Sequence, residues 1–156
     1  MSQVIVREAV PHDVPALREL MLAYIVDFYK YPAPEEDKLN ALIHKLLDQI
    51  VGIQFVAVAE DGGLVGFATL YFTYSTLRAT QVTVMNDLFV VEAERGKDVA
   101  AKLFLACKAY SAKHGYGNMS WVTARDNARA QAFYDKMGGQ RSDWQDYAID
   151  PAGTPE

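Results

Sequence analysis

A short turn that combines glycine with basic residues is the first part of this sequence with an evident chemistry. It reads Arg95-Gly96-Lys97 and directly precedes an amphipathic run, Val99 to Lys113. A helix N-terminus presents main-chain N–H groups without intrahelical partners and the positive end of the helix dipole. The turn therefore suits a phosphate or diphosphate, since Gly96 has no Cβ to hold a ligand away from the backbone. The alternative is an ordinary solvated turn, which so short a motif also permits.

A second group of residues lies downstream, from Asn127 to Tyr134. Ala130, Phe133 and Met137 recur at helical spacing, which predicts a helix with an apolar face toward the core. Tyr134 lies beside that face, and its hydroxyl could reach a cleft. The alternative is a core helix with a surface tyrosine.

Two further segments carry carboxylates. Asn86-Asp87 lies in a β-type run, and in a regular strand the two side chains would face opposite sides. The acidic and aromatic segment Asp27–Asp37 could hold an ammonium group by charge and by cation–π contact, or could simply be a solvated helix start. The candidate amine-binding residues of that segment are Tyr29, Tyr31, Glu35, Glu36 and Asp37.

Strands and helices must position these groups, and hydrophobic periodicity predicts both. A hairpin turn is expected at 61–63, a left-handed helix end at Gly115, and Asp13 as the N-cap or first-turn acid of the first helix. We expect one α+β domain over residues 1–150 and a tail at 151–156, with an antiparallel meander followed by a parallel crossover. The predicted strands are 3–9, 53–59, 64–74, 81–91, 118–124 and 144–149, and the predicted helices are 14–28, 35–50, 99–113 and 128–137.

Composition limits the class of protein. The chain has 156 residues, 51% of them hydrophobic, which is enough for a sizeable core. A formal charge of −5 argues against a nucleic-acid binder, and no apolar run approaches the length of a membrane span. We expect a cytoplasmic protein without a metal site, in which the lone Cys107 is a buried structural thiol and Trp121 and Trp144 belong to the core.

The order of these motifs resembles the GNAT superfamily of N-acetyltransferases. In that superfamily the turn reads Arg/Gln-x-x-Gly-x-Gly/Ala, which this chain matches at Arg95 and Ala100 but not at Asp98, where glycine is usual. The spacing Asn-x-x-Ala-x-x-Phe-Tyr, followed by Gly138-Gly139, is similar to the other half of its cofactor site. The run 66–74 and the strand after it most resemble the diamine (spermidine/spermine) N-acetyltransferase branch.

The resemblance implies the GNAT fold, a mostly antiparallel sheet flanked by helices with a V-shaped splay between two parallel strands. It implies that acetyl-CoA lies in this splay, that Asn127 holds its amide arm, and that Tyr134 protonates the departing thiolate. Asn86 stands where the branch has a glutamate that takes up the amine proton, which an amide cannot do. The cofactor-binding residues implied are Leu88, Phe89, Val90, Val91, Arg95, Gly96, Lys97, Asp98, Val99, Ala100, Asn127, Ala130, Phe133 and Tyr134.

The predicted function is acetyl transfer from acetyl-CoA to a primary amine of a small cationic molecule by direct attack. The catalytic candidates are Tyr134 and Asn86, and the substrate-binding candidates are Tyr29, Tyr31, Glu35, Asn86 and Asp87. Two alternatives stay open: an acceptor that is a peptide N-terminus or a lysine, and a non-catalytic acyl-CoA sensor, which Asn86 and Asp98 would favour. The resemblance also implies a homodimer.

Overall fold

A five-stranded mixed sheet forms the centre of the first of two units into which the chain divides, Met1–Val122 and Thr123–Glu156. The computed structural model describes residues 3–153. The strands follow one another in space as they do in the sequence, antiparallel from β1 to β4 and parallel between β4 and β5. They are β1 Ile5–Glu8, β2 Gly52–Val58, β3 Leu64–Ser75, β4 Thr80–Val90 and β5 Met119–Ser120.

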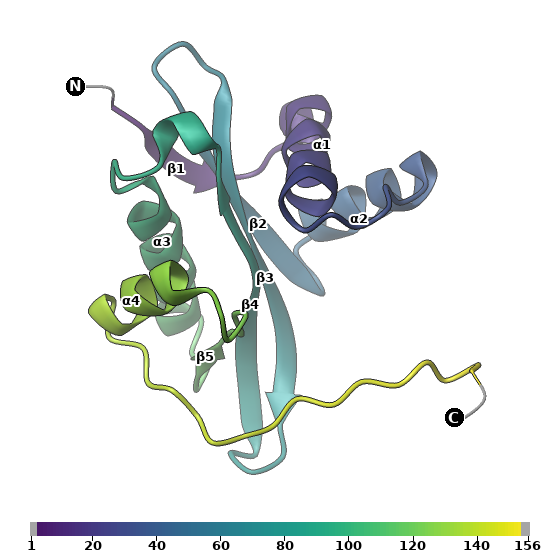
Figure 1. Cartoon of the computed structure of the whole chain (residues 1–156), viewed down its shortest axis with the longest axis vertical. Coiled ribbons are helices and arrows are strands. Elements are labelled where there is room, and N and C mark those ends of the chain that lie inside the picture. The colour runs from purple at the N-terminus through teal and green to yellow at the C-terminus, as the bar shows by residue number, and fades with distance from the viewer. Residues whose placement is uncertain (1–2, 154–156) are drawn as a thin grey trace. The chain divides into compact units, whose positions relative to one another are not determined.

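Helices cover both faces of this sheet, α1 and α2 on one face and α3 on the other (Figure 1). Each helix turns an apolar stripe inward, with Leu17 and Ile43 on one face and Leu103 on the other fully buried. Because both faces are covered, β2 is buried almost throughout. The helices of this unit are α1 Val14–Leu22, a π-helix η2 Ala23–Phe28, α2 Glu36–Leu47 and α3 Val99–Lys113, with 3-10 turns η1 Pro11–Asp13 and η3 Glu92–Glu94.

Strand β4 contains the irregularity that opens the sheet. Thr69 of β3 pairs with Asp87, but Leu70 pairs with Met85, so Asn86 is an extra residue in a β-bulge. The parallel partner β5 pairs only with Thr83 and Val84. Beyond that point no strand in the described part of the chain pairs with β4 on the β5 side, and this is the predicted splay.

Several local predictions are confirmed. Gly115 follows α3 with a φ of 76°, and Gly62 forms the hairpin turn with a φ of 88°. Cys107 is fully buried, and this burial raises the pKa of its thiol to about 12. Asp13 is at the N-cap position of α1, but its buried carboxylate does not cap that helix. The carboxylate accepts two hydrogen bonds from Arg7 at 2.7 and 2.9 Å and one from the main-chain N–H of Val10 at 2.8 Å.

The second unit contains one helix, α4 Ala128–Lys136, in its described residues. The side chain of Asn127 caps it by accepting a hydrogen bond from the main-chain N–H of Ala130 at 3.1 Å. The predicted strand 144–149 is wrong, since residues 140–150 form neither helix nor strand. A strand is stable only against a partner, and the described part of this unit supplies none.

Two tryptophans were predicted to lie in the core. Trp144 does not, because its side chain is 79% exposed on the extended segment. Trp121 is half-buried and packs edge-on against Phe104 at 5.1 Å between ring centroids. The predicted strand 118–124 is likewise reduced to Met119–Ser120. No helix among the described residues combines the length and apolar character that a membrane span requires.

Candidate functional site

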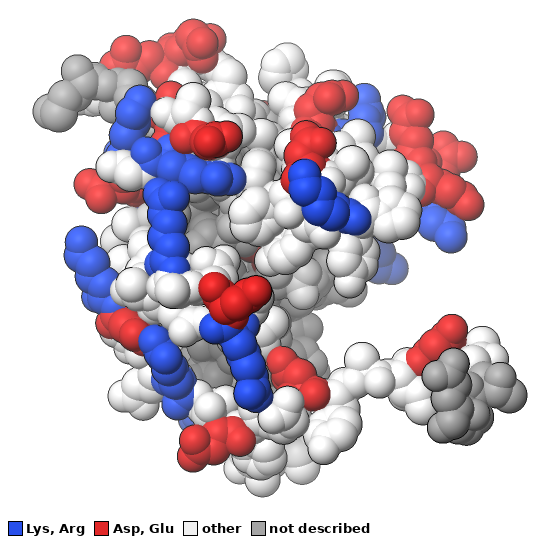
Figure 2. Space-filling view, viewed as in Figure 1, with Lys and Arg blue, Asp and Glu red and all other residues white. Residues whose placement is uncertain are grey.

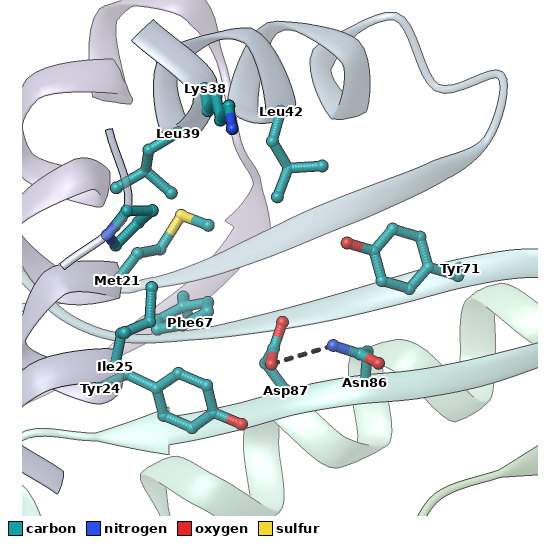
Figure 3. A pocket seen from close by; sticks show the side chains of 11 residues that line it. Met21, Tyr24, Ile25, Lys38, Leu39, Leu42, Phe67, Tyr71, Asn86 and Asp87 are labelled. Carbon is teal, nitrogen blue, oxygen red and sulfur yellow. Dashed lines mark hydrogen bonds between the residues drawn. The ribbon is translucent and has the colours of Figure 1, made fainter. Parts of the chain in front are cut away.

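A cavity of about 310 Å³ lies in the first unit, between the α1–η2–α2 layer and strands β3 and β4 (Figure 3). Its walls are mostly apolar, with two phenols, one amide, one carboxylate and one ammonium group among them. The lining residues are Met21, Tyr24, Ile25, Pro34, Lys38, Leu39, Leu42, Phe67, Tyr71, Asn86 and Asp87.

The π-helix η2 presents Tyr24 and Ile25 to this cavity. π-Helical turns are rare and are found disproportionately at functional sites. The ring of Tyr24 packs edge-on against Phe67 at 5.5 Å and Phe89 at 5.6 Å. These contacts with the sheet fix the ring, and its hydroxyl lies on the Asp87 side of the cavity (Figure 3).

The bulge in β4 brings Asn86 and Asp87 to the same cavity. The expectation that their side chains face opposite sides is wrong, because the extra residue interrupts the alternation of a regular strand. The Asn86 side-chain amide donates a hydrogen bond from Nδ2 to Oδ1 of Asp87 at 3.1 Å (Figure 3). This bond orients the carboxylate at the point where β4 has lost its parallel partner.

The carboxylate of Asp87 acts on both phenols of the cavity. Burial raises the pKa of Tyr24, and the negative charge of Asp87 raises it further. The pKa of Tyr71 is raised for the same two reasons, burial first and Asp87 second. Both hydroxyls therefore stay protonated at neutral pH. Within residues 3–153, neither Asp87 nor Lys38 forms an ion pair, so one unpaired charge of each sign borders the cavity.

The structure does not bring all of the predicted acceptor residues to this cavity. Tyr29 is 49% exposed and Tyr31 is 68% exposed, and neither they nor Glu35 line it. Tyr29 instead packs edge-on against Tyr24 at 5.0 Å. The segment contributes Pro34, and α2 contributes Lys38.

Sequence reasoning missed Tyr24, Tyr71 and Lys38. Tyr24 recurs at helical spacing with the apolar residues of the predicted helix 14–28, and this pattern gives no sign of a functional role. Tyr71 lies in an aromatic strand where nothing distinguishes it from Phe72. Only the pairing of β3 with the bulged β4 shows which of these rings meets Asp87.

The N-terminus of α3 offers a row of unpartnered main-chain donors. The first N–H of the helix to be bonded is that of Lys102, which donates to the carbonyl of Asp98 at 3.0 Å. The N–H groups of 96–101 have no acceptor among the described residues. Gly96, with a φ of 80°, and Asp98, with a φ of 65°, shape the turn before them. Free donors at a positive helix end fit a diphosphate.

The basic side chains of this turn are already engaged. Arg95 donates from Nε to the carbonyl of Val90 at 3.1 Å, and its guanidinium carbon lies 5.7 Å from the Phe28 ring centroid. Lys97 lies 3.5 Å from a carboxylate oxygen of Glu94, and Lys102 donates to the carbonyl of Val4 at 2.9 Å. Figure 2 shows basic side chains with acidic ones between them over the region where η3 leads into α3. Main-chain N–H groups would therefore make more of the contacts with a diphosphate, and basic side chains fewer, than the sequence indicates.

Asp98 occupies a conformation that favours glycine. Its φ of 65° and ψ of 10° lie in the left-handed region, and its exposed side chain makes no capping hydrogen bond. Val99, by contrast, is buried beneath the turn.

Strand β4 exposes main-chain groups along the splay. The N–H of Val91 donates to the carbonyl of Val65 at 2.9 Å. Main-chain N–H groups point alternately to the two sides of a strand. The N–H of Phe89 therefore also points toward β3, whereas the N–H groups of Leu88 and Val90 point away from it. The N–H groups of Leu88 and Val90 therefore point to the side where no strand among residues 3–153 pairs with them, and the Phe89 side chain is buried.

In the second unit, α4 carries the remaining predicted residues. Tyr134 and Phe133 are half-buried neighbours, with their ring centroids 5.4 Å apart. Asn127 precedes the helix with its side-chain oxygen engaged in the cap, and Ala130 receives that cap.

The sequence model of the Acetyltransferase (GNAT) family matches residues 16–139. This stretch is well over half of the chain and includes the bulged strand, the turn and α4. The chain belongs to the GNAT family. This GNAT protein is an acetyl-CoA-dependent N-acyltransferase, and its mixed sheet, with helices on both faces and a splay between β4 and β5, is the fold that the resemblance implied.

This GNAT protein is similar to two curated relatives in sequence and to one solved structure in fold. It is 29% identical to the uncharacterized N-acetyltransferase YhfO of Bacillus subtilis over 133 residues, covering 85% of this chain and 87% of that protein. It is 30% identical to the D-amino-acid N-acetyltransferase HPA3 of Saccharomyces cerevisiae, covering 87% and 84% of the two proteins. The aminoglycoside N-acetyltransferase AAC(6')-Iy in complex with CoA has a TM-score of 0.83 at 19% identity, covering 97% of each chain, which shows the shared fold.

Proposed function

We propose that this enzyme, over residues 1–150, transfers an acetyl group from acetyl-CoA to a primary amine of a small molecule that arrives as a cation. The observation that carries the proposal is the unpaired carboxylate of Asp87 in the cavity, beside the bulge where β4 leaves β5. An ammonium group is attracted by that charge, and the protonated phenols of Tyr24 and Tyr71 offer it further polar contacts.

The apolar walls support a small acceptor with an aliphatic part. Met21, Ile25 and Leu42 are among the apolar side chains that line the cavity. Pockets of this kind bind small molecules by apolar burial and orient them by a few polar groups. The D-amino-acid N-acetyltransferase named above has a small amine as its acceptor, which agrees with the proposal.

The proton of the ammonium group must leave before nitrogen can attack. Asn86 has no basic group, and Asp87 is the carboxylate among the described residues that line the cavity. We assign the removal of this proton to Asp87, directly or through a water molecule. Asn86 then acts by orienting Asp87 through their 3.1 Å hydrogen bond.

The main chain of β4 and of the α3 turn would hold acetyl-CoA, which supplies the thioester. The donors at 96–101 suit its diphosphate, and the free N–H groups of Leu88 or Val90 suit its carbonyl oxygen as negative charge develops there. In the transfer, the amine nitrogen bonds to the carbonyl carbon and the carbon–sulfur bond breaks. Tyr134 gives its proton to the sulfur, and the second proton, which the nitrogen loses as the amide forms, passes through water to the Tyr134 phenolate.

Release of free thiol from acetyl-CoA, measured with a panel of amines, tests this function. The panel should contain diamines, amino acids, an aminoglycoside and a short peptide with a free N-terminus. We expect turnover with at least one small amine, and Asp87→Asn should lower kcat/KM for it at least about tenfold while leaving the KM for acetyl-CoA unchanged. Asp48→Asn, at an exposed helix end outside the cavity, is the matched control.

Two outcomes would replace the proposal. Turnover with the peptide alone would favour a polypeptide acceptor. Tight binding of CoA without turnover of any amine would favour an acyl-CoA sensor. The departures of Asn86 and Asp98 from the family pattern would agree with that result.

We also propose that the enzyme is a homodimer. Support comes from the extended segment of the second unit, where the side chains of Trp144, Tyr147 and Ile149 are 79%, 92% and 82% exposed. Large apolar side chains this exposed commonly mark an interface. Sedimentation equilibrium should give twice the chain mass, and replacing all three residues with serine should give monomers. A wild-type monomer at all concentrations would refute the dimer.

A further inference from the structure

The cavity has a cation as well as an anion, and the proposed function uses only the anion. Lys38 of α2 lines the cavity, and Figure 3 draws it on the opposite side from Asp87 of β4. In the part of the chain that the structure describes, no carboxylate lies within ion-pair distance of its ammonium group. The nearby acids Glu36 and Asp37 leave Lys38 unpaired and do not line the cavity.

The position of Lys38 in its helix does not explain its presence. It is the third residue of α2, near the positive end of the helix dipole, where a cation is disfavoured. Lysine is a good helix former, but glutamate or glutamine would serve this exposed turn as well without the unfavourable charge. An anion bound in the cavity would be attracted both by Lys38 and by the helix end.

The surface between the two charges is apolar. Met21, Ile25, Leu39 and Leu42 lie in the lining together with Lys38, whereas Asn86 and Asp87 lie on the sheet side. This pattern of anion, apolar wall and cation is complementary to a molecule with an amine, an aliphatic part and a carboxylate. A diamine would bring its second ammonium group toward Lys38, where like charges repel.

We propose that the acceptor is an amino acid, and that Lys38 selects it by binding its carboxylate while Asp87 receives its amine. This inference rests on the proposed function and narrows its substrate class. Lys38 is a specificity-determining residue in this scheme and takes no part in the transfer itself.

A set of matched amines tests the selection. Pentylamine, 1,5-diaminopentane and 5-aminopentanoate have the same chain and differ only in the far group, and norleucine adds a carboxylate beside the amine of pentylamine. With the wild-type enzyme, we expect one of the two carboxylates to raise kcat/KM about fivefold over pentylamine, and 1,5-diaminopentane to be the poorest acceptor. A factor of about five is the upper end of what a partly exposed ion pair supplies.

Variants at position 38 assign the preference to this side chain. Lys38→Met keeps the aliphatic stem and should abolish the advantage of the carboxylate, so that the ratio of kcat/KM between the carboxylates and pentylamine falls to about one. Lys38→Glu should make 1,5-diaminopentane the best of the four. Lys45→Met removes an exposed lysine of the same helix outside the cavity and should leave every ratio unchanged.

The outcomes separate this inference from the function on which it rests. If the wild-type enzyme acetylates pentylamine or the diamine as well as the carboxylates, or if Lys38→Met retains the preference, the role of Lys38 is refuted and the acetyltransferase remains. If no amine is acetylated and none binds to the CoA-loaded protein in calorimetry, the proposed function fails as well.

Discussion

Replacing Asp98 with glycine should strengthen CoA binding and should not weaken the fold. Asp98 directly precedes α3, in a left-handed conformation with a φ of 65°. Its exposed side chain makes no capping bond that the substitution would remove. Glycine adopts positive φ without the clash that a Cβ creates, so the turn keeps its shape.

Two contributions determine the size of the effect. A left-handed residue other than glycine costs roughly 1 kcal/mol, at the low end for aspartate, which should appear as greater stability of Asp98→Gly. A carboxylate near a bound phosphate costs about 1 kcal/mol at 4 Å in water, which should appear in the affinity. Because 1.4 kcal/mol is a factor of ten, CoA should bind about fivefold more tightly to the variant.

Titration calorimetry with CoA and thermal unfolding measure the two contributions separately. Asp98→Asn removes only the charge, so it should match Asp98→Gly in CoA affinity. Asp98→Ala also removes the charge but keeps the strained backbone, so it should melt roughly 2–4 °C below Asp98→Gly. A loss of CoA affinity in both Asp98→Gly and Asp98→Asn would refute the reasoning, since the carboxylate would then contribute to binding.

Three further predictions follow from individual side chains. Tyr134→Phe should lower kcat at least about 100-fold with the CoA dissociation constant unchanged, and wild-type turnover would remove this phenol from the mechanism. Asp13→Asn should cost about 2 kcal/mol in urea unfolding at pH 7, because a buried carboxylate bound by Arg7 is lost. The hydrogen bond from Arg7 lowers the pKa of Asp13 in the folded protein. The stability that Asp13 contributes is therefore fully present above the carboxyl pKa of the unfolded chain and disappears as the pH falls through the lower pKa of the folded protein. An equal loss of unfolding free energy in Asp13→Asn at pH 2 would contradict this reasoning. Cys107, whose buried thiol has its pKa raised to about 12, should resist iodoacetamide at pH 8 until the protein is denatured, and rapid native labelling would show that it is exposed.

The turns and the bounds of α3 could be predicted from the sequence, because each depends on residues within one short segment. Gly62 and Gly115 have the positive φ values that their turns require, and α3 begins and ends at the predicted residues, Val99 and Lys113. These features are determined by backbone freedom and by the periodicity of one face, which a single segment contains. The turn before α3 could be predicted for the same reason.

The cavity could not be predicted in this way, because it depends on pairing between distant segments. The register between β3 and β4 shifts at Asn86, and that shift alone places Asn86 and Asp87 together. A periodic pattern assumes a regular strand and therefore separates them. Lys38 lies in an acidic helix start, and its neighbours in sequence gave no sign that it would border the cavity.

The strand predicted at 144–149 failed for a related reason. Trp144, Tyr147 and Ile149 have the residue types of a strand, but strand formation also requires a neighbour with a free edge. The described part of the second unit has no such strand. Residue propensity shows only what a segment can form, and its partner decides the outcome.

The central claim is that main-chain donors of β4 and of the α3 turn hold the acetyl donor. Amide chemical shifts of the labelled protein, recorded while CoA is added, test it most directly. We predict saturable shifts at Leu88, at Val90 and at residues 96–101, with the amides of the hairpin at 61–63 unaffected. Shifts confined to other parts of the protein, or no saturable shift at all, would contradict the claim.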